Sequence, residues 1–530
     1  MKIKEFGVEV WMNEYENDCI HNLAETCVES LTLDQLLEIA GKKKTILDEL
    51  LPIKLAYGAI EGSDRLRDEV STLYNKQSRE NVLISHGAIG ANALVHSTLV
   101  SPGDRVISVL PTYQQHYSIP ESFGADVQIL KLREENAFLP DLDELKELAT
   151  NNTSLIAINN PNNPTGSLMD EQFLNEIVDI ARSCDAYLLC DEVYRGIDQE
   201  GNGFTASVAD LYEKGISTGS MSKSFSLAGL RLGWIVGPVD LLHAVSIHRD
   251  YTTISVGVID DHLSAIALEN RDAILQRSRQ MTRTNLAILD EWIAKEPLIS
   301  YIKPKSATVA LLKYDLDISS RDFCVKLLES KGVMLTPGSA MDMEGYLRIG
   351  FANNTQTMKI GLQKTIFNGV NLSGKDLSYS DFTYASFVDT NLENTNLTGA
   401  KFVDVDLTKI KNKSLAGADL SRTSFAYSNL SDVSLVGAIL ELNNFKNANL
   451  SGLDFSVTDV ITDGLIFIKS NLSNSNFEGV DLSPQKIFFN VFENKAYLMR
   501  DQTQSSTAEQ NIKNELFHDS RVLIIYSEVR

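Results

Sequence analysis

Short apolar runs alternate with amphipathic stretches from about residue 80 to residue 240. Each run is bounded by turn residues, which is typical of buried strands. The runs are Val82–Ser85, Arg105–Val109, Val127–Lys131, Leu155–Asn159, Tyr187–Cys190 and Trp234–Val236. Helical patterns lie between them, for example Asp170–Cys184, in which Asp170 is a candidate N-cap. This alternation predicts an α/β fold whose sheet is mostly parallel and is covered by helices on both faces.

The segments on either side of this block have a mixed and largely helical pattern, with one strand-like run at Thr308–Lys313. Because they lie at both ends of the block, we predict a second, smaller α/β domain built from residues 1–49 and 271–366. The larger domain is then expected over about residues 50–270.

From Phe367 onward the large apolar residues recur at every fifth position. The series runs unbroken to Leu407, resumes after a phase shift at Leu415 and ends at Leu482. A period of five fits neither an alternating strand nor an amphipathic helix. A short strict period instead indicates a solenoid, whose repeats bury their large residues by stacking on one another.

The repeat resembles the pentapeptide-repeat family, whose motif A(D/N)Lxx stands here as GADLS, NANLS, GAKFV and NTNLT. The resemblance covers residues 367–482 and implies a right-handed quadrilateral β-helix with one pentapeptide on each side. Interruptions at Ile410–Ser414 and Val460–Ser470 are expected to form local bulges or loops. Residues 483–530 are then a C-terminal tail.

The chain is acidic, with 48 basic and 71 acidic residues and a net charge of −23. This balance argues against nucleic acid or an anionic membrane as a partner, since both need clustered Lys and Arg. No apolar run reaches the ~18–20 residues of a membrane span, and the charged N-terminus has no signal-peptide core. The five cysteines and eight histidines lack the spacing of a disulfide framework or metal site. We therefore expect a cytoplasmic protein without a metal centre.

Two motifs place polar side chains where predicted strands end. The turn NNPNNPTG, Asn159–Gly166, would aim side chains out of the carboxyl edge of the sheet, where ligands bind in open α/β folds. Alone, such a turn is often only a turn. Asp191 ends another apolar run, and a carboxylate buried there is costly unless it faces a cation, such as a protonated heterocyclic nitrogen. A helix-capping aspartate is the alternative.

Two further motifs supply an amine and an anion site. The segment Thr218–Trp234 contains two hydroxyls, an amine and a guanidinium, on Ser220, Ser222, Lys223 and Arg231. Hydroxyls with arginine suit a phosphate dianion, and a lysine among small residues suits a Schiff base. A solvated loop is the alternative. The sequence HGAIG at His86–Gly90 lets N–H groups at a helix N-terminus approach an anion.

The motifs NPTG, DEVY and SxSK occur in this order, with Asp191 and Lys223 separated by 32 positions. In this the chain resembles fold-type-I pyridoxal-phosphate enzymes of the class I/II aminotransferase family, over about residues 30–365. The resemblance implies pyridoxal 5'-phosphate as cofactor. It also implies transfer of an amino group between two small molecules, an L-amino acid and a 2-oxo acid, by a catalytic domain at 1–366.

By this resemblance, Lys223 matches the Schiff-base lysine that also carries the proton. Asp191 matches the carboxylate that keeps the pyridine nitrogen protonated, because a buried anion raises the pKa of that nitrogen. Asn163 and Tyr194 match the pair that bonds the 3'-oxygen of the cofactor. Tyr113, in PTYQQHY, matches the aromatic residue that stacks on the ring; a core aromatic is the alternative.

The phosphate and substrate positions follow in the same way. The expected phosphate cup consists of Gly87, Ala88, Ile89, Ser220, Ser222 and Arg231. Arg348, in YLRIGFA, matches the arginine that binds the substrate carboxylate, with Asn163 beside it; a surface strand residue is the alternative. Tyr57 matches the tyrosine that reaches the cofactor phosphate of the partner subunit, which implies a homodimer.

The N-terminal signature of the family, a glycine-containing loop before a Pro-Asp-Phe turn, is missing. Residues 21–41 stand in its place and are similar to those of capreomycidine-synthase-like enzymes. These keep the aminotransferase fold but perform β-elimination and cyclisation on a hydroxyarginine. They need an acid to receive the guanidinium, for which Glu25 and Glu29 are candidates; a solvated helix face is the alternative.

Three functions therefore stay open. The first is an aminotransferase, and the second is a pyridoxal-phosphate-dependent β-elimination or cyclisation enzyme that acts on an arginine-derived amino acid with the same residues. The third is an interaction protein that binds a protein partner through its repeats. Some pentapeptide-repeat proteins resemble DNA in shape and charge, but residues 367–530 carry a net charge of only −6. For the repeats we favour a scaffold or oligomerisation arm.

Overall fold

The computed structural model describes residues 2–294, 296, 298–363, 371–383, 385–458, 460–461, 465–477 and 486–488. The chain forms two compact units. The N-terminal unit comprises Met1–Asp290, Tyr301–Lys313 and Met334–Met358. The repeat unit comprises Glu291–Ser300, Tyr314–Val333 and Lys359–Arg530. The predicted division of residues 1–366 into a large and a small domain stays a prediction.

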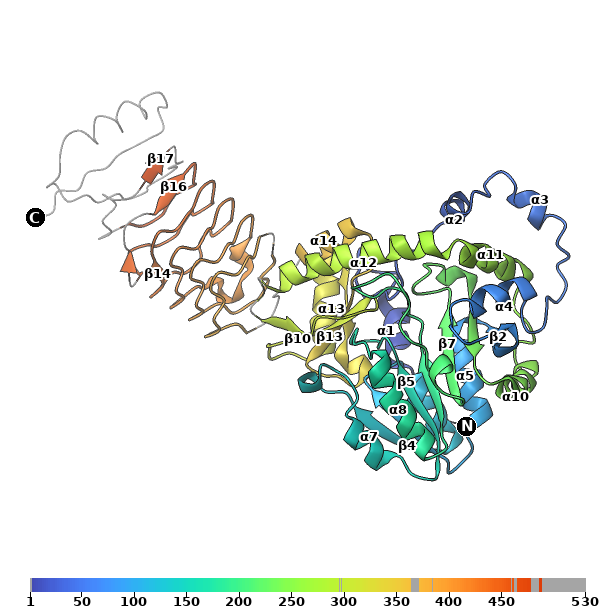
Figure 1. Cartoon of the computed structure of the whole chain (residues 1–530). Coiled ribbons are helices and arrows are strands. Elements are labelled where there is room, and N and C mark those ends of the chain that lie inside the picture. The colour runs from blue at the N-terminus through green and yellow to red at the C-terminus, as the bar shows by residue number, and fades with distance from the viewer. Residues whose placement is uncertain are drawn as a thin grey trace, which may run out of the picture. The chain divides into compact units, whose positions relative to one another are not determined.

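The sheet of the N-terminal unit has the order β2-β8-β7-β6-β5-β3-β4 (Figure 1). Its strands are β2 (Val82–Ser85), β3 (Arg105–Leu110), β4 (Asp126–Lys131), β5 (Thr153–Asn159), β6 (Tyr187–Asp191), β7 (Gly215–Ser220) and β8 (Gly233–Val236). Strands β4, β3, β5, β6 and β7 pair in parallel, while β8 is antiparallel to both of its neighbours. The prediction of a mostly parallel sheet is thus confirmed.

Strand β7 was not among the predicted strands, because its sequence GISTGS is small and polar rather than apolar. The strand is nevertheless buried along its whole length. A Cβ atom at Gly219 would lie 2.5 Å from the indole of Trp234 on β8. A side chain is therefore excluded at position 219 by the neighbouring tryptophan, which weakens the apolar signal of the strand.

Helices cover both faces of this sheet. In chain order the described helices are α1 (Gly7–Tyr15), α2 (Leu33–Ile39), α3 (Ile46–Leu50), α4 (Asp64–Ser71), α5 (Gly87–Leu99), α6 (Gln115–Phe123), α7 (Leu142–Leu148), α8 (Glu171–Ser183), α9 (Val208–Leu211), α10 (Val239–Asp250), α11 (Val258–Glu269), α12 (Arg271–Ile293), α13 (Ser320–Lys331) and α14 (Thr355–Gln363). Helices α5 and α10 share one apolar core with the sheet, and α7 and α8 share another. Asp170 caps α8 by accepting a hydrogen bond from the N–H of Phe173 (2.9 Å), as expected.

No described helix has both the length and the apolar character to cross a membrane.

Strand β13 (Tyr346–Gly350) lies antiparallel between β12 (Thr336–Pro337) and β10 (Val309–Tyr314), which covers the predicted run at Thr308–Lys313. The other short strands outside the repeats are β1 (His21–Asn22), β9 (Ile299–Tyr301) and β11 (Val333–Met334).

The repeats form stacked coils whose backbones pair in parallel. Asn371 pairs with Asn391 and Asp376 with Asn396, each 20 residues further on, which is four pentapeptides per coil. The predicted interruption at Ile410–Ser414 contains a short 3₁₀ turn, Lys411–Lys413, and another such turn, Leu407–Lys409, directly precedes it. Further along, β14 (Ile439–Leu440) pairs with β15 (Val460–Ile461), and β16 (Ile466–Ile468) pairs with β17 (Lys486–Phe488).

The large residues of the five-residue series are buried wherever the structure describes them, from Leu372 to Phe477. Phe367, Leu482 and almost all of the predicted tail lie outside the described residues. Inside the coils the rings of Phe402, Phe425, Phe445 and Phe467 stack at centroid distances of 5.4–5.5 Å. Leu298 belongs to the same buried core as the repeats, which is why residues 291–300 fall into the repeat unit.

Replacing Phe402 by Ala should destabilise the repeat unit by about 3–5 kcal/mol, because the coils above and below cannot collapse into the lost ring volume. Chemical denaturation of the full chain, followed by circular dichroism, measures this loss. The control is Val436→Ala at an exposed position of the repeats, with an expected change below about 0.5 kcal/mol. Equal effects of the two substitutions would contradict the stacked core.

Candidate active site

Three parallel strands bring their carboxyl ends together at one edge of the sheet. The pairing places Asn159 at the end of β5 beside Asp191 at the end of β6, and Asp191 beside Thr218 on β7. The NNPNNPTG turn begins at Asn159 and the DEVY motif at Asp191, and the SxSK motif begins at Ser220, two residues after Thr218. Sequence motifs that are far apart in the chain therefore meet here, as expected for a ligand site in an α/β sheet.

Asp191 is 4% exposed and is held by polar neighbours. Its Oδ2 accepts a hydrogen bond from Asn92 Nδ2 on α5 (2.9 Å), and Nε2 of His116 lies 3.8 Å from the same oxygen. Thr218 Oγ1 in turn donates to Asn92 Oδ1 (2.7 Å), which fixes the orientation of the amide. Sequence analysis missed Asn92 and His116, since nothing in the pattern separates them from other helical polar residues.

Lys223 follows β7 and lies against the segment at residues 22–31. Its Nζ donates to Thr26 Oγ1 (2.5 Å) and lies 3.4 Å from Cys27 Sγ. Burial works to lower the pKa of Lys223, but Cys27, Tyr194 and Glu25 more than offset this and raise it above the ordinary value. Burial raises the pKa of Cys27 to about 11, so that it is a neutral thiol at physiological pH.

Glu25 and Glu29, the two candidate acids, have different surroundings. Glu25 Oε1 accepts from the N–H groups of Thr26 (2.6 Å) and Cys27 (2.8 Å). Burial works to raise its pKa, but Lys223 and these donors lower it overall, so Glu25 is a carboxylate beside the lysine. Glu29 is exposed and accepts from the N–H of Asn354 (3.0 Å).

Arg348, Asn163 and Tyr194 also belong to this site, and Arg348 Nη2 donates to the carbonyl of Ala24 (3.3 Å) in the segment at residues 22–31. Arg348 is 3% exposed; its Nη1 donates to Asn163 Oδ1 (3.3 Å) and its Nη2 to Thr336 Oγ1 (3.1 Å). Burial lowers the pKa of Arg348 and raises that of Tyr194. Within the described part of the chain, Arg348 Nε and Tyr194 Oη have no hydrogen bond of good geometry. Buried polar atoms of this kind are normally paired, so they indicate a ligand.

Tyr113 lines a small pocket together with Asn163 and Arg348. Its Oη donates to Glu9 Oε1 (3.4 Å), and burial and the charge of Glu9 raise its pKa. The side of its ring packs against Phe6, at a centroid distance of 4.9 Å.

The residues predicted for the phosphate cup lie around the first turn of α5 and the end of β7. Gly87, Ala88 and Ile89 form the first turn of α5, whose N–H groups are free to bind an anion. Gly87 has a φ of +65°, and a Cβ atom there would lie 3.2 Å from Arg231 Nη2. Ser220 and Ser222 are buried at the end of β7, where the N–H of Ser222 donates to Ser220 Oγ (3.3 Å). Tyr57 stands apart and is 79% exposed on the loop between α3 and α4.

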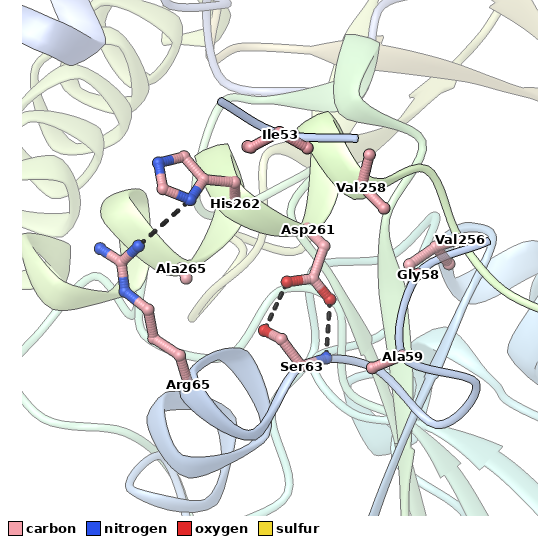
Figure 2. A pocket seen from close by; sticks show the side chains of 10 residues that line it. All are labelled: Ile53, Gly58, Ala59, Ser63, Arg65, Val256, Val258, Asp261, His262 and Ala265. Carbon is pink, nitrogen blue, oxygen red and sulfur yellow. Dashed lines mark hydrogen bonds between the residues drawn. The ribbon is translucent and has the colours of Figure 1, made fainter. Parts of the chain in front are cut away.

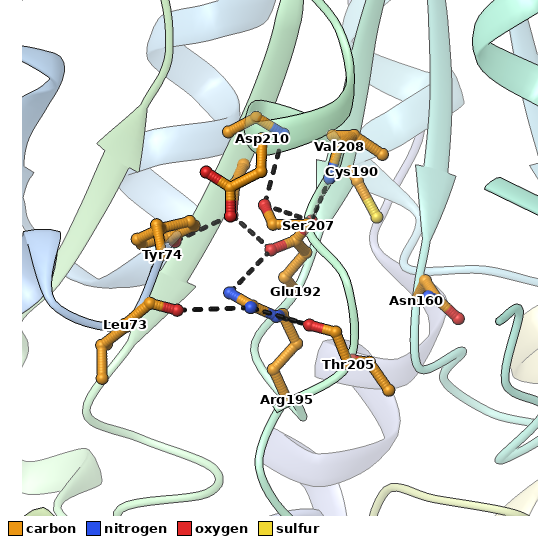
Figure 3. Close-up of polar contacts among 12 residues, drawn as sticks. Leu73, Tyr74, Asn160, Cys190, Glu192, Arg195, Thr205, Ser207, Val208 and Asp210 are labelled. Carbon is orange, nitrogen blue, oxygen red and sulfur yellow. Dashed lines mark hydrogen bonds and ion pairs between the residues drawn. The ribbon is translucent and has the colours of Figure 1, made fainter. Parts of the chain in front are cut away.

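Glu192 of the DEVY motif forms a buried ion pair with Arg195 (Figure 3). Glu192 lies 3.2 Å from Arg195 Nη1 and accepts from Ser217 Oγ (2.7 Å) and Ser207 Oγ (2.9 Å). Burial raises the pKa of Glu192, and the positive charge of Arg195 offsets part of this increase. Arg195 also donates to the carbonyl of Thr205 (2.8 Å). This network fixes the backbone between Asp191 and Tyr194, and sequence analysis did not identify it.

The family model for aminotransferase class I and II matches residues 40–364. The chain belongs to this family. Its cofactor is accordingly pyridoxal phosphate. The model for pentapeptide repeats matches residues 376–411, 414–441 and 429–459, with eight copies.

Individual relatives include both aminotransferases and cyclases. Capreomycidine synthase of Streptomyces vinaceus is 29% identical over 358 residues, which are 67% of this chain and 91% of that enzyme. The crystal structure of a PLP-dependent aminotransferase from Streptococcus suis is 43% identical, with a TM-score of 0.67 over 68% of this chain and 96% of that chain. The PLP-dependent cyclase OrfR is 25% identical, with a TM-score of 0.63 over 68% and 96% of the two chains.

The residues at the site fit this cofactor. A buried carboxylate suits its ring nitrogen, the unpaired Tyr194 Oη suits a ring oxygen, and the first turn of α5 with Arg231 suits its phosphate. Lys223 provides the amine.

Gly233→Ala should weaken pyridoxal-phosphate binding roughly tenfold or more, because the cup loses its fit to the phosphate. The added Cβ would lie 2.4 Å from the carbonyl carbon of Gly87 and 2.6 Å from the nitrogen of Ala88, so α5 must move. Equilibrium dialysis of the full chain measures the affinity. Gly229→Ala on the same segment has open space around its Cβ and is the control. Equal affinities of the two variants would show that this contact does not shape the cup.

Proposed function

We propose that this chain is a pyridoxal-phosphate-dependent aminotransferase that moves the amino group of an L-amino acid with a cationic side chain to a 2-oxo acid. The observation that carries the proposal is the carboxylate of Glu25, held beside Lys223 by two backbone N–H groups. A charged acid at this place favours a guanidinium or ammonium group at the end of the substrate side chain.

Two further acids extend this negative region. Glu9 lies beside Tyr113. Its negative charge works to raise the pKa of Arg348, which burial lowers. The pKa of Glu16 is raised by burial and by the charges of Glu25 and Glu9. Because like charges gathered in one region repel, a cation bound among them relieves an unfavourable interaction.

The residues of the chain divide the chemistry among them. When bound, the cofactor supplies an electron sink that acidifies the Cα–H bond of the amino acid. Arg348 binds the substrate carboxylate through its guanidinium, with Asn163 beside it. Asp191 holds the proton on the ring nitrogen, and Lys223 Nζ takes the Cα proton and returns it. Tyr194 would donate its O–H to the ring oxygen of the bound cofactor.

A second candidate function is β-elimination and cyclisation of an arginine-derived amino acid. It is supported by the likeness to capreomycidine synthase over 91% of that enzyme and by the likeness to a cyclase. The same Arg348, Asp191 and Lys223 would serve, and only the fate of the substrate differs.

The enzyme is proposed to be a homodimer in which Tyr57 reaches the site of the partner subunit. Its loop exposes apolar side chains, with Leu51 78%, Leu55 83% and Tyr57 79% exposed, and exposed apolar patches mark interfaces. A cavity of about 240 Å³ opens beside this loop and is lined by Gly58, Ala59 and Val258 (Figure 2). There Asp261 accepts from the N–H (2.9 Å) and Oγ (2.5 Å) of Ser63, which fixes the end of the loop.

For the rest of the chain we keep the boundaries 1–366, 367–482 and 483–530. The parallel pairing at intervals of four pentapeptides supports a right-handed quadrilateral β-helix for the repeats. A scaffold or oligomerisation role, with a protein partner bound to this β-helix, is the function we assign to it.

With L-arginine that carries ¹⁵N at its α-amino group and unlabelled pyruvate, we expect ¹⁵N in newly formed alanine, because the chain moves the α-amino group to the acceptor. Mass spectrometry of the products measures the transfer. Lys223→Ala removes the base and should abolish it. Loss of water from 3-hydroxyarginine without any ¹⁵N transfer would instead establish the cyclisation function.

Glu25→Gln should raise the KM for L-arginine about tenfold and leave the KM for L-citrulline nearly unchanged, because only arginine is cationic at the end of its side chain. Steady-state kinetics with both substrates measures the ratio. Glu29→Gln removes an exposed acid of the same segment and is the matched control. A parallel loss for both substrates would show that Glu25 does not recognise the cation.

A further inference from the structure

Residues 22–31, which we call the strap, cross the site and are tied to the N-terminal unit along their length. Backbone bonds run from Leu23 N to Met334 O (3.0 Å), from Gly350 N to Leu23 O (2.7 Å), from Glu29 N to Ala352 O (2.9 Å) and from Leu31 N to Ser226 O (3.0 Å). A Cβ atom at Gly350 would lie 1.8 Å from Glu25 O, so β13 and the strap are in close contact. The strap is thus a fixed wall of the site.

Thr26 occupies the point of the strap nearest Lys223. Its carbonyl accepts from Thr308 Oγ1 (2.6 Å) and its N–H donates to Glu25 Oε1 (2.6 Å). With the backbone held on both sides, its Oγ1 accepts from Lys223 Nζ at 2.5 Å. The two residues are 197 positions apart in the chain.

The other groups of the strap are poorer partners for this amine. Cys27 Sγ lies 3.4 Å away and is a neutral thiol, which is a weak acceptor. Glu25 Oε1 is already occupied by two N–H donors. A hydroxyl can accept from the amine and still donate its own proton, and the buried Tyr194 Oη is a neighbour of Thr26.

We propose that Thr26 is a positioning residue that holds the free amine of Lys223 on the strap and aims it for proton transfer. This role of Thr26 rests on the proposed function in one respect, namely that Lys223 is the base that takes the Cα proton. When Nζ takes the Cα proton, one N–H of the resulting ammonium donates to Thr26 Oγ1, and Thr26 keeps its own proton throughout.

The first test measures the Lys223 amine itself. In the full chain freed of cofactor, competitive acetylation with acetic anhydride across a pH series, with mass spectrometry of the Lys223 peptide, gives its pKa. Thr26→Val has nearly the same volume but no acceptor for the ammonium, so the pKa should fall by about 0.5–1 unit. Thr26→Ser keeps the hydroxyl and should restore most of this difference.

The second test measures proton transfer in the holoenzyme. With L-arginine in D₂O, exchange of the Cα hydrogen should slow about tenfold in Thr26→Val and less than about threefold in Thr26→Ser. Thr72→Val makes the same chemical change at an exposed helix end, where Thr72 Oγ1 bonds only the Glu69 carbonyl (2.6 Å), and is the control for both tests.

An unchanged pKa in Thr26→Val, or exchange equally slow in the valine and serine variants, would overturn the proposal. A circular dichroism spectrum and melting point equal to those of the parent chain show that the valine variant is folded. If the parent enzyme exchanges no Cα hydrogen of L-arginine, the proposed function fails. In that case the pKa measurement still decides the role of Thr26.

Discussion

The carboxylate of Asp191 ends a central strand at a place that water hardly reaches. Burying such a charge costs several kcal/mol unless it is paired or bonded. Asn92 and the N–H of Val193 (3.2 Å) offset part of this cost, and in the proposed function the protonated ring nitrogen of the bound cofactor would supply the remaining cation. Around this constraint the neighbouring strand β7 is built mostly of small residues, the Glu192–Arg195 pair fixes the turn, and α5 begins at the proposed phosphate site.

The strap is the segment in which this chain departs from the sequence pattern of its family. In place of a glycine-containing loop it presents a carboxylate, a hydroxyl and a thiol to Lys223, from Glu25, Thr26 and Cys27. In the proposed function the carboxylate selects for a positive charge, and the hydroxyl gives the free amine a defined place. Both roles depend on backbone bonds that hold the strap to β13 and its neighbours. The proposals for substrate choice and proton transfer therefore rest on one short segment.

Sequence alone predicted those parts of the structure whose signal is local. The strands, the five-residue period and the residues Asp191, Lys223 and Asn163 each follow from a pattern within a few positions. Strand β7 could not be predicted, because its residues are mostly small and polar and Trp234 leaves no room for a side chain at Gly219. The contact of Thr26 with Lys223 and that of Asn92 with Asp191 join distant segments, so no local pattern contains them. The role proposed for the exposed Tyr57 requires a second copy of the chain.

The identity of the lysine that carries the cofactor underlies the whole account. Reduction of the cofactor-loaded full chain with sodium borohydride fixes the cofactor to its amine, and peptide mass mapping then locates the modified residue. We predict one modified lysine, Lys223, with the other lysines unmodified. A pyridoxyl group on a different lysine, or none on Lys223 at full cofactor occupancy, would contradict the assignment of the site.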